Sequence, residues 1–188
     1  MRFKGLVLAV PVLLGAVPVI AQAVGAPQPP ATTNTLAIPS PHYATIHLEA
    51  LIDRPAAEAW KRIGKYCDIG EWLQMPCRLT AGDDWSVGSV RLLRESVIEV
   101  LVGRTPLSYT YTQPVRVGTP YNLYHGTLAL EPVSARRSKL VYTLFFDNSM
   151  LADDAAREAD LAMRRARFGK AVEMMKMLAE GGKSSAAK

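Results

Sequence analysis

The stretch DDAAREADLAMRRARFGKAVEMMKMLAEG, residues 153–181, decides the fold. Its large apolar residues recur at helical spacing and form one stripe, made of Leu161, Phe168, Val172, Met175 and Leu178. Asp153 and Asp154 stand where acidic side chains favour the positive start of a helix, and Gly181 ends it. A helix of about 27 residues is about 40 Å long. We therefore expect it to cross the whole face of a small sheet.

The residues before this helix predict that sheet. Residues 45–52 alternate apolar and polar side chains, as a half-buried strand does. Six further strands are predicted between turns rich in glycine, proline and charged residues, at 78–81, 89–94, 97–102, 107–113, 123–131 and 139–147. No helical segment separates these six ranges, which indicates antiparallel connections.

Two short helices are predicted after the first strand. Pro55 is well placed in the first turn of a helix over 56–66, with Trp60 and Ile63 on its inner side. A second helical stretch is predicted around 68–73. The whole order favours an α+β architecture in which a curved, seven-stranded antiparallel sheet wraps around the long C-terminal helix.

The first 23 residues have the layout of a secretory signal peptide. Arg2 and Lys4 precede sixteen uncharged, mostly aliphatic residues, and the small-x-small pattern ending at Ala23 predicts cleavage after Ala23. The alternative is a membrane anchor, which needs roughly 20 apolar residues. This run is shorter and contains two prolines. Cleaved export to the periplasm or the outside of the cell is therefore the preferred interpretation, with no stable membrane insertion afterwards.

Composition divides the remaining chain into a linker, one domain and a tail. Residues 24–41 are rich in proline and poor in large apolar residues, which is typical of an extended linker. The folded domain is expected over 42–181 and a disordered tail over 182–188. Without the two basic residues of the signal, the net charge falls from +5 to +3. No aromatic-basic motif accompanies this charge, so a nucleic-acid partner is not expected.

Two cysteines, Cys67 and Cys77, are candidates for a disulfide. In an oxidising compartment such a pair would close a short loop and stabilise the fold by roughly 3 kcal/mol. The competing interpretation is metal binding, but the three histidines show no ligand spacing with the cysteines. We therefore expect a structural disulfide, no metal site and no cofactor.

Several segments resemble the START-like superfamily, also called SRPBCC or Bet v 1-like, and within it the polyketide cyclase/dehydrase and lipid-transport group. The segments are the Asp-Arg-Pro-Ala-Ala-Glu-Ala-Trp run at 53–60, Trp72, Gly-Ser-Val-Arg at 88–91, Glu99, the strand at 108–111 and Tyr124. The resemblance spans 46–178. It implies a helix-grip fold with a cavity between the sheet and the long helix, where lipids, sterols, hormones or aromatic polyketides are taken up. It implies no shared catalytic motif.

Strand alternation places candidate side chains in that cavity. In 107–113 the hydroxyl residues share one face, so Tyr109 and Tyr111 are expected inside, and Arg91 has the parity to join them. Similarity to abscisic acid receptors of the superfamily adds Glu99, Tyr124 and Tyr142. The candidate ligand-binding set is Trp72, Arg91, Glu99, Tyr109, Tyr111, Tyr124, Tyr142 and Phe168.

A filled core is the alternative for these residues, with the tyrosines pairing with one another and with Glu99 and Arg91. Arg91 and Glu99 themselves could form a buried ion pair or, in a shifted register, lie at the surface. Arg164 lies four residues after Asp160 and is expected to pair with it at the surface, although it could also reach the cavity.

Three functions remain open. The first is a non-catalytic, monomeric carrier or binder of a hydrophobic small molecule. The second is a cyclase- or dehydratase-like enzyme that uses pocket tyrosines with Glu99 or Arg91 for general acid–base chemistry. The third is an interaction module whose cavity is filled. The sequence contains no nucleophile elbow, Walker loop, dinucleotide fingerprint or zinc-protease motif.

Overall fold

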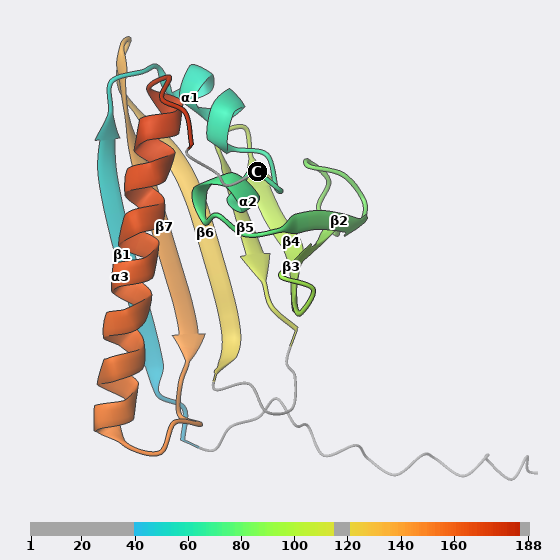
Figure 1. The fold of residues 1–188 in the computed structure, drawn as a ribbon, viewed down its shortest axis with the longest axis vertical. Helices are drawn as coiled ribbons and strands as arrows, with labels where there is room; N and C mark the ends of the chain where they lie inside the picture. The colour runs from blue at the N-terminus through green and yellow to red at the C-terminus, as the bar shows by residue number, and fades with distance from the viewer. Residues whose placement is uncertain (1–39, 115–120, 185–188) are drawn as a thin grey trace, which may run out of the picture. The chain divides into compact units, whose positions relative to one another are not determined.

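A computed structural model describes residues 40–114 and 121–184 of the 188-residue chain. The expected signal peptide, most of the expected linker and the last four residues of the expected tail lie outside the described residues. The described part is an α+β unit with one sheet, two short helices and one long helix (Figure 1). Within this part, no helix is long and apolar enough to cross a membrane.

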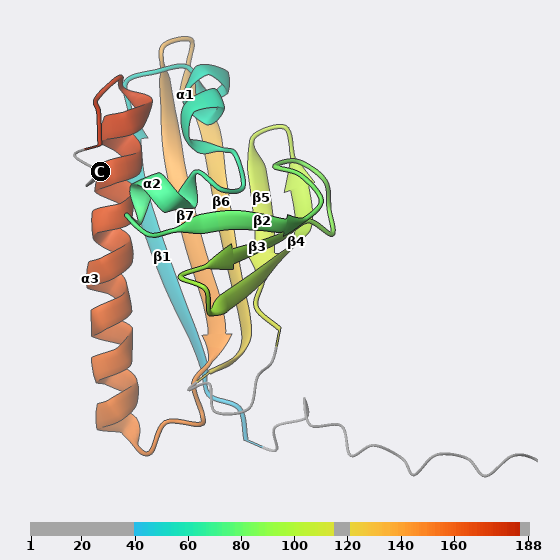
Figure 2. The same ribbon diagram turned by 45° about the vertical axis from the view of Figure 1, so that its right-hand side comes forward.

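Seven antiparallel strands form the sheet, in the order β1-β7-β6-β5-β4-β3-β2. Their bounds are Tyr43–Ile52 (β1), Cys77–Ala81 (β2), Val90–Leu93 (β3), Val97–Thr105 (β4), Ser108–Thr112 (β5), Asn122–Ser134 (β6) and Arg137–Asp147 (β7). The first strand therefore closes one edge beside the last. In the view of Figure 2, α2 and β2 cross in front of β6 and β7, which shows the curvature of the sheet. The predicted fold class and all seven strands are confirmed.

The long helix α3 (Asp154–Ala179) lies along β1 and β7 (Figure 1). The side chain of Asp153 accepts a hydrogen bond from the Ala156 amide at 2.8 Å and so caps its first turn. Gly181 follows the helix with a φ of +99°, a left-handed conformation that glycine adopts without strain. The predicted start and end of the helix are confirmed.

The buried stripe of α3 is shorter than predicted. Phe168, Val172, Met175 and Leu178 are buried, but Leu161 is only half-buried. No residue of α3 before Phe168 is fully buried. The prediction treated the whole stripe as buried, whereas Leu161 packs against the core without being fully buried, and full burial is confined to the C-terminal half of the helix.

Two basic side chains of α3 also reach the free edge of β1. Arg165 donates to the carbonyl oxygen of Thr45 at 3.3 Å, and Lys176 donates to the carbonyl oxygen of Leu51 at 2.7 Å. These carbonyls lie on the outer side of β1, an edge strand, because their positions alternate with those that bond to β7.

The short helices α1 (Ala56–Ile63) and α2 (Ile69–Trp72) follow β1. Trp60 and Ile63 are buried, as predicted. Helix α1 ends three residues earlier than the predicted Tyr66. Gly64 terminates it, because glycine is a poor helix former and a Cβ at this position would overlap the Trp60 ring.

Cys67 and Cys77 form a disulfide, as predicted. It links Cys67, two residues before α2, to the first residue of β2 and encloses the α2 segment. Ile69, Trp72 and Met75 of this segment are buried in the core. The disulfide therefore anchors both ends of a segment that is also held by these buried side chains and by the ion pair of Glu71 with Arg62.

Replacing both cysteines with serine should lower the free energy of unfolding by about 3 kcal/mol, because the unfolded chain regains the freedom of the open loop. Urea unfolding of the oxidised protein and of the double variant measures the difference. Dithiothreitol should reproduce the loss in the parent protein and have no effect on the variant. An unchanged urea midpoint would contradict a structural role for the disulfide.

Asp68, next to this disulfide, should make stability depend on pH. Burial raises the pKa of its carboxyl to about 6, and the Lys65 amide that donates to it only partly offsets this. A raised pKa means that the folded state binds the proton more tightly than the unfolded chain. Asp68 therefore makes its full contribution to the free energy of unfolding below about pH 4. This contribution is lost as the pH rises through 6. Asp68→Asn should remove this pH dependence of the free energy of unfolding. Urea unfolding at successive pH values measures it in both proteins. An equally steep dependence in both would refute the raised pKa of Asp68.

Candidate functional site

A cavity of about 330 Å³ lies between α3, the α2 segment and the strands β3 to β6. This volume falls at the lower end of the range for small-molecule sites. Its apolar wall is made of Ile69, Leu73, Met75, Leu93, Val97, Met163 and Phe168. Its polar wall is made of Arg94, Ser96, Glu99, Tyr111, Gln113, Tyr121, Tyr124, Arg164 and Arg167.

The structure brings only part of the predicted set to this cavity. Glu99, Tyr111, Tyr124 and Phe168 line it. The other four are buried but do not line it, namely Trp72, Arg91, Tyr109 and Tyr142. All eight therefore lie inside the molecule, and their roles in binding a ligand remain predictions.

Arg91 and Glu99 form a buried ion pair directly across β3 and β4. Arg91 is 0% exposed and Glu99 is 2% exposed. Arg91 Nε donates to Glu99 Oε2 at 2.7 Å, and Arg91 Nη1 donates to the Tyr66 carbonyl oxygen. The guanidinium also lies 4.1 Å from the centroid of the Tyr66 ring and 4.7 Å from that of Tyr111. The sequence allowed either a buried ion pair or two surface charges, and the structure contains the buried pair.

Electrostatics keep Arg91 charged. Burial alone lowers the pKa of the Arg91 guanidinium, but the charge of Glu99 and the surrounding phenols outweigh burial and raise it. A proton therefore stays on Arg91 across the accessible pH range, and its positive charge is neutralised within the protein by Glu99.

A chain of hydrogen bonds leads from this pair to the rim of the cavity. Gln113 Nε2 donates to Glu99 Oε1 at 2.8 Å, and the Tyr121 hydroxyl donates to Gln113 Oε1 at 2.7 Å. Both carboxylate oxygens of Glu99 thus accept hydrogen bonds from protein groups. Glu99 is therefore held in place as an acceptor within the wall, by Arg91 on one oxygen and by Gln113 on the other.

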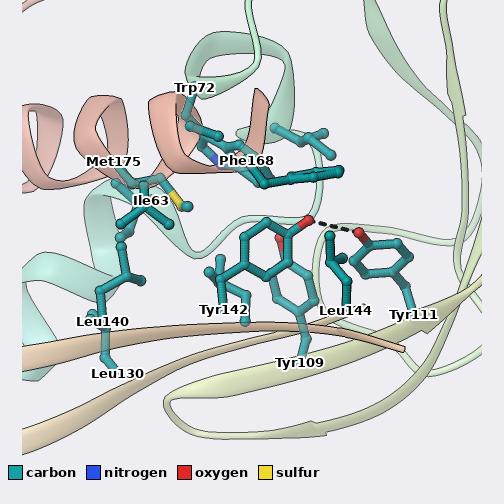
Figure 3. Packing of buried hydrophobic residues seen from close by; sticks show 14 of the residues in the cluster. Ile63, Trp72, Tyr109, Tyr111, Leu130, Leu140, Tyr142, Leu144, Phe168 and Met175 are labelled. Carbon is teal, nitrogen blue, oxygen red and sulfur yellow. Dashed lines mark hydrogen bonds between the residues drawn. The ribbon is translucent and has the colours of Figure 1, made fainter. Parts of the chain in front are cut away.

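Tyr111 and Tyr124 line the cavity, and Tyr142 lies behind them in the core. The Tyr111 and Tyr142 hydroxyls share a hydrogen bond of 2.7 Å, drawn as a dashed line in Figure 3. Phe168 and Trp72 pack edge-on against the Tyr142 ring, with centroid distances of 5.4 Å and 5.8 Å (Figure 3). Burial raises the pKa of Tyr111, Tyr124 and Tyr142. These phenols stay protonated and offer hydroxyl groups for hydrogen bonding.

Gly126 is a site residue that sequence reasoning missed. It lies opposite Tyr111 in the β5–β6 register, and a Cβ at this position would overlap the Tyr111 ring. The absence of a side chain lets the ring lie over β6, with its hydroxyl against Tyr142. The available signal was a lone glycine inside a predicted strand, which often marks close approach by another group.

Arg164 lies inward, so its expected surface location was wrong and the alternative, that it reaches the cavity, is the one present. It pairs with Asp160 at 2.7 Å, as predicted, but both side chains are largely buried, with 13% and 12% exposed. The guanidinium lies over the aromatic rim of the cavity, 4.7 Å from the Tyr121 centroid and 4.8 Å from that of Phe146. The pairing is therefore an inward contact, because this turn of α3 lies above the rim.

Removing the charge of Glu99 should destabilise the fold strongly. Glu99→Gln leaves the Arg91 charge buried without a counter-ion, which lowers the free energy of unfolding by about 3–5 kcal/mol. The double variant Arg91→Met with Glu99→Met should recover most of this loss, because it replaces both charges with apolar side chains of similar size. Urea unfolding measures both values. A loss below about 1 kcal/mol in the single variant would contradict the buried pair.

Across 40–114 and 121–184, no cluster of three or more histidine, cysteine, aspartate or glutamate side chains is placed to hold a metal ion. The polar wall consists of guanidinium, phenol, aliphatic hydroxyl and amide groups and one ion-paired carboxylate, a set suited to organic molecules.

Comparison with solved structures finds the same fold in several proteins. A protein from Thermobifida fusca is 19% identical, with a TM-score of 0.61 over 76% of this chain and 99% of that one. An aromatase/cyclase from a Streptomyces species is 16% identical, with a TM-score of 0.58 over 76% and 100%. Norcoclaurine synthase from Thalictrum flavum, in complex with dopamine and hydroxybenzaldehyde, is 12% identical, with a TM-score of 0.59 over 78% and 91%.

The TM-scores show a shared fold, and at such low sequence identity they show the fold alone. A comparison with curated protein sequences finds no match. The family model described as polyketide cyclase / dehydrase and lipid transport matches residues 43–180, which include every strand and helix described above. The chain therefore belongs to the polyketide cyclase/dehydrase and lipid transport family.

Proposed function

We propose that this protein is an exported, non-catalytic binder or carrier of a hydrophobic small molecule. The observation that carries the proposal is the cavity of about 330 Å³ between α3 and the sheet. Members of this fold family commonly bind hydrophobic ligands, and the structure of norcoclaurine synthase with two small aromatic molecules is one instance.

The make-up of the cavity wall supports a mostly apolar ligand with one or two polar atoms. Leucine, valine, methionine and phenylalanine side chains supply the surface that an apolar body would cover. The hydroxyls of Tyr111 and Tyr124 and the amide of Gln113 supply hydrogen-bonding groups at fixed places. An open volume of this size also favours binding over an interaction module with a filled interior.

The polar groups favour binding over acid–base catalysis. A general base needs a free basic atom near the substrate. Glu99 has both oxygens engaged by Arg91 and Gln113, and the raised pKa values keep Tyr111 and Tyr124 protonated. These groups suit recognition of a ligand better than removal of its protons.

The disulfide supports export. Disulfides form and persist in oxidising compartments such as the periplasm or the extracellular space. The charged, apolar and small-residue segments of 1–23 agree with this destination. We propose that cleavage after Ala23 releases the domain from its signal.

Protein purified from its native host should carry a small molecule that native mass spectrometry detects. The expected spectrum has a species heavier than the polypeptide, and denaturation should release the extra mass as an organic compound. The apolar fluorescent probe N-phenyl-1-naphthylamine should also bind to protein from which that compound has been removed. If neither the bound compound nor probe binding is observed, the proposed function is wrong.

Removing single hydroxyls should show where the ligand lies. Tyr111→Phe and Tyr124→Phe should each weaken retention of the host compound about fivefold, since a lost hydrogen bond is worth about 1 kcal/mol. Tyr43→Phe is the matched control, because Tyr43 is 54% exposed and lies outside the residues that line the cavity. Titration followed by native mass spectrometry compares the three. Equal effects at Tyr43 and Tyr124 would contradict placement of the ligand in the cavity.

A further inference from the structure

The cavity and a neighbouring surface groove share two arginines in their linings, Arg94 and Arg167. Beside the inner cavity of about 330 Å³ lies an outer groove of about 670 Å³, between the α2 segment and α3. The lining residues common to both are Leu73, Arg94 and Arg167. The cavity and the groove therefore adjoin, and two guanidinium groups belong to their shared rim.

The two arginines come from segments far apart in the sequence. Arg94 lies in the turn between β3 and β4 with a φ of +48°, and its amide donates to the Pro76 carbonyl oxygen at 3.1 Å. Arg167 lies on α3, one residue before Phe168 of the cavity wall. The fold thus brings a hairpin turn and a helix together to build this rim.

Neither arginine has an acidic partner. The other two arginines near the cavity are neutralised, Arg91 by Glu99 and Arg164 by Asp160. Among the residues that the structure describes, no ion pair includes Arg94 or Arg167. Lys170 and Glu173 also line the outer groove, so the groove has three cations and one carboxylate. The shared rim is therefore positively charged and open to an anion.

Apolar surface extends from this rim in both directions. Trp72, Met174 and Met177 line the outer groove, while Leu93, Val97 and Phe168 line the inner cavity. A ligand that matches both features has one anionic group and an apolar body. The planar guanidinium group suits carboxylates, because its N–H groups form parallel hydrogen bonds to both oxygens.

We propose that the ligand is a hydrophobic carboxylate whose carboxylate group binds Arg94 and Arg167 and whose apolar body fills the inner cavity. This inference rests on the proposed function and specifies the class of ligand. The anionic group stays at the rim, because the inner wall offers neutral phenols and the carboxylate of Glu99, with Arg91 already paired. An inner cavity near the lower size limit favours a single chain or ring system over a two-chain phospholipid.

Laurate and lauryl alcohol test the proposal, because they share a hydrocarbon chain and differ at the head group. Each competes with N-phenyl-1-naphthylamine for the full-length protein after removal of any host compound, at pH 8 and low salt. Laurate should displace the probe at a concentration about tenfold below that of the alcohol, as expected for about 1.4 kcal/mol from two charge-assisted contacts. Added salt should reduce this preference.

The double variant Arg94→Gln with Arg167→Gln should bind laurate about tenfold more weakly and lauryl alcohol as before. The matched control is Arg136→Gln with Arg137→Gln, which removes the same two charges from the exposed β6–β7 turn. All four arginines are exposed, so circular dichroism should show unchanged folding. The control should keep the preference for laurate.

The possible failures are distinguishable. The carboxylate site is overturned if laurate and lauryl alcohol compete equally or if neither competes. It is also overturned if the control variant loses as much laurate affinity as the Arg94 and Arg167 variant. In each case, binding of the probe still supports the cavity. If the probe itself does not bind and no compound accompanies host-purified protein, the proposed function and this inference fail together.

Discussion

The buried pairing of Arg91 with Glu99 constrains the interior around the cavity. Two full charges have been taken out of water, so each must keep its partner or destabilise the fold by several kcal/mol. The pair ties β3 to β4, reaches the backbone of Tyr66 after α1, and holds Gln113 at the end of β5. Three separate segments therefore take their positions from one guanidinium and one carboxylate.

The cavity exists because the long helix is only partly used for packing. From Phe168 onwards, α3 buries side chains against the sheet in the ordinary way. Before Phe168 it carries arginines, and Arg164 lies across an aromatic rim instead of filling the interior. Gly126 contributes on the opposite side by leaving room for the Tyr111 ring. The cavity is thus bounded by Arg164 on the helix side and by the Tyr111 ring, which Gly126 accommodates, on the sheet side.

Local patterns in the sequence predicted the elements, while the details of the site depended on distant contacts. Strand alternation placed Tyr109 and Tyr111 inside, since it reflects the geometry of a single strand. The helix stripe overestimated the burial of Leu161, because periodicity does not show how much of a helix meets the sheet. The inward position of Arg164 and the meeting of Arg94 with Arg167 depend on how the curved sheet faces α3, and no short segment contains that information.

The bonds from Arg165 and Lys176 to β1 bear on how copies of the protein behave in concentrated solution. An uncovered edge strand offers a row of backbone groups to which another chain can add as an extra strand. Here two carbonyl groups, at Thr45 and Leu51 near opposite ends of β1, already accept hydrogen bonds from cationic side chains. An incoming strand would have to displace both and bury their charges. The helix that covers the interior thus also protects the β1 edge of the sheet from pairing with another chain.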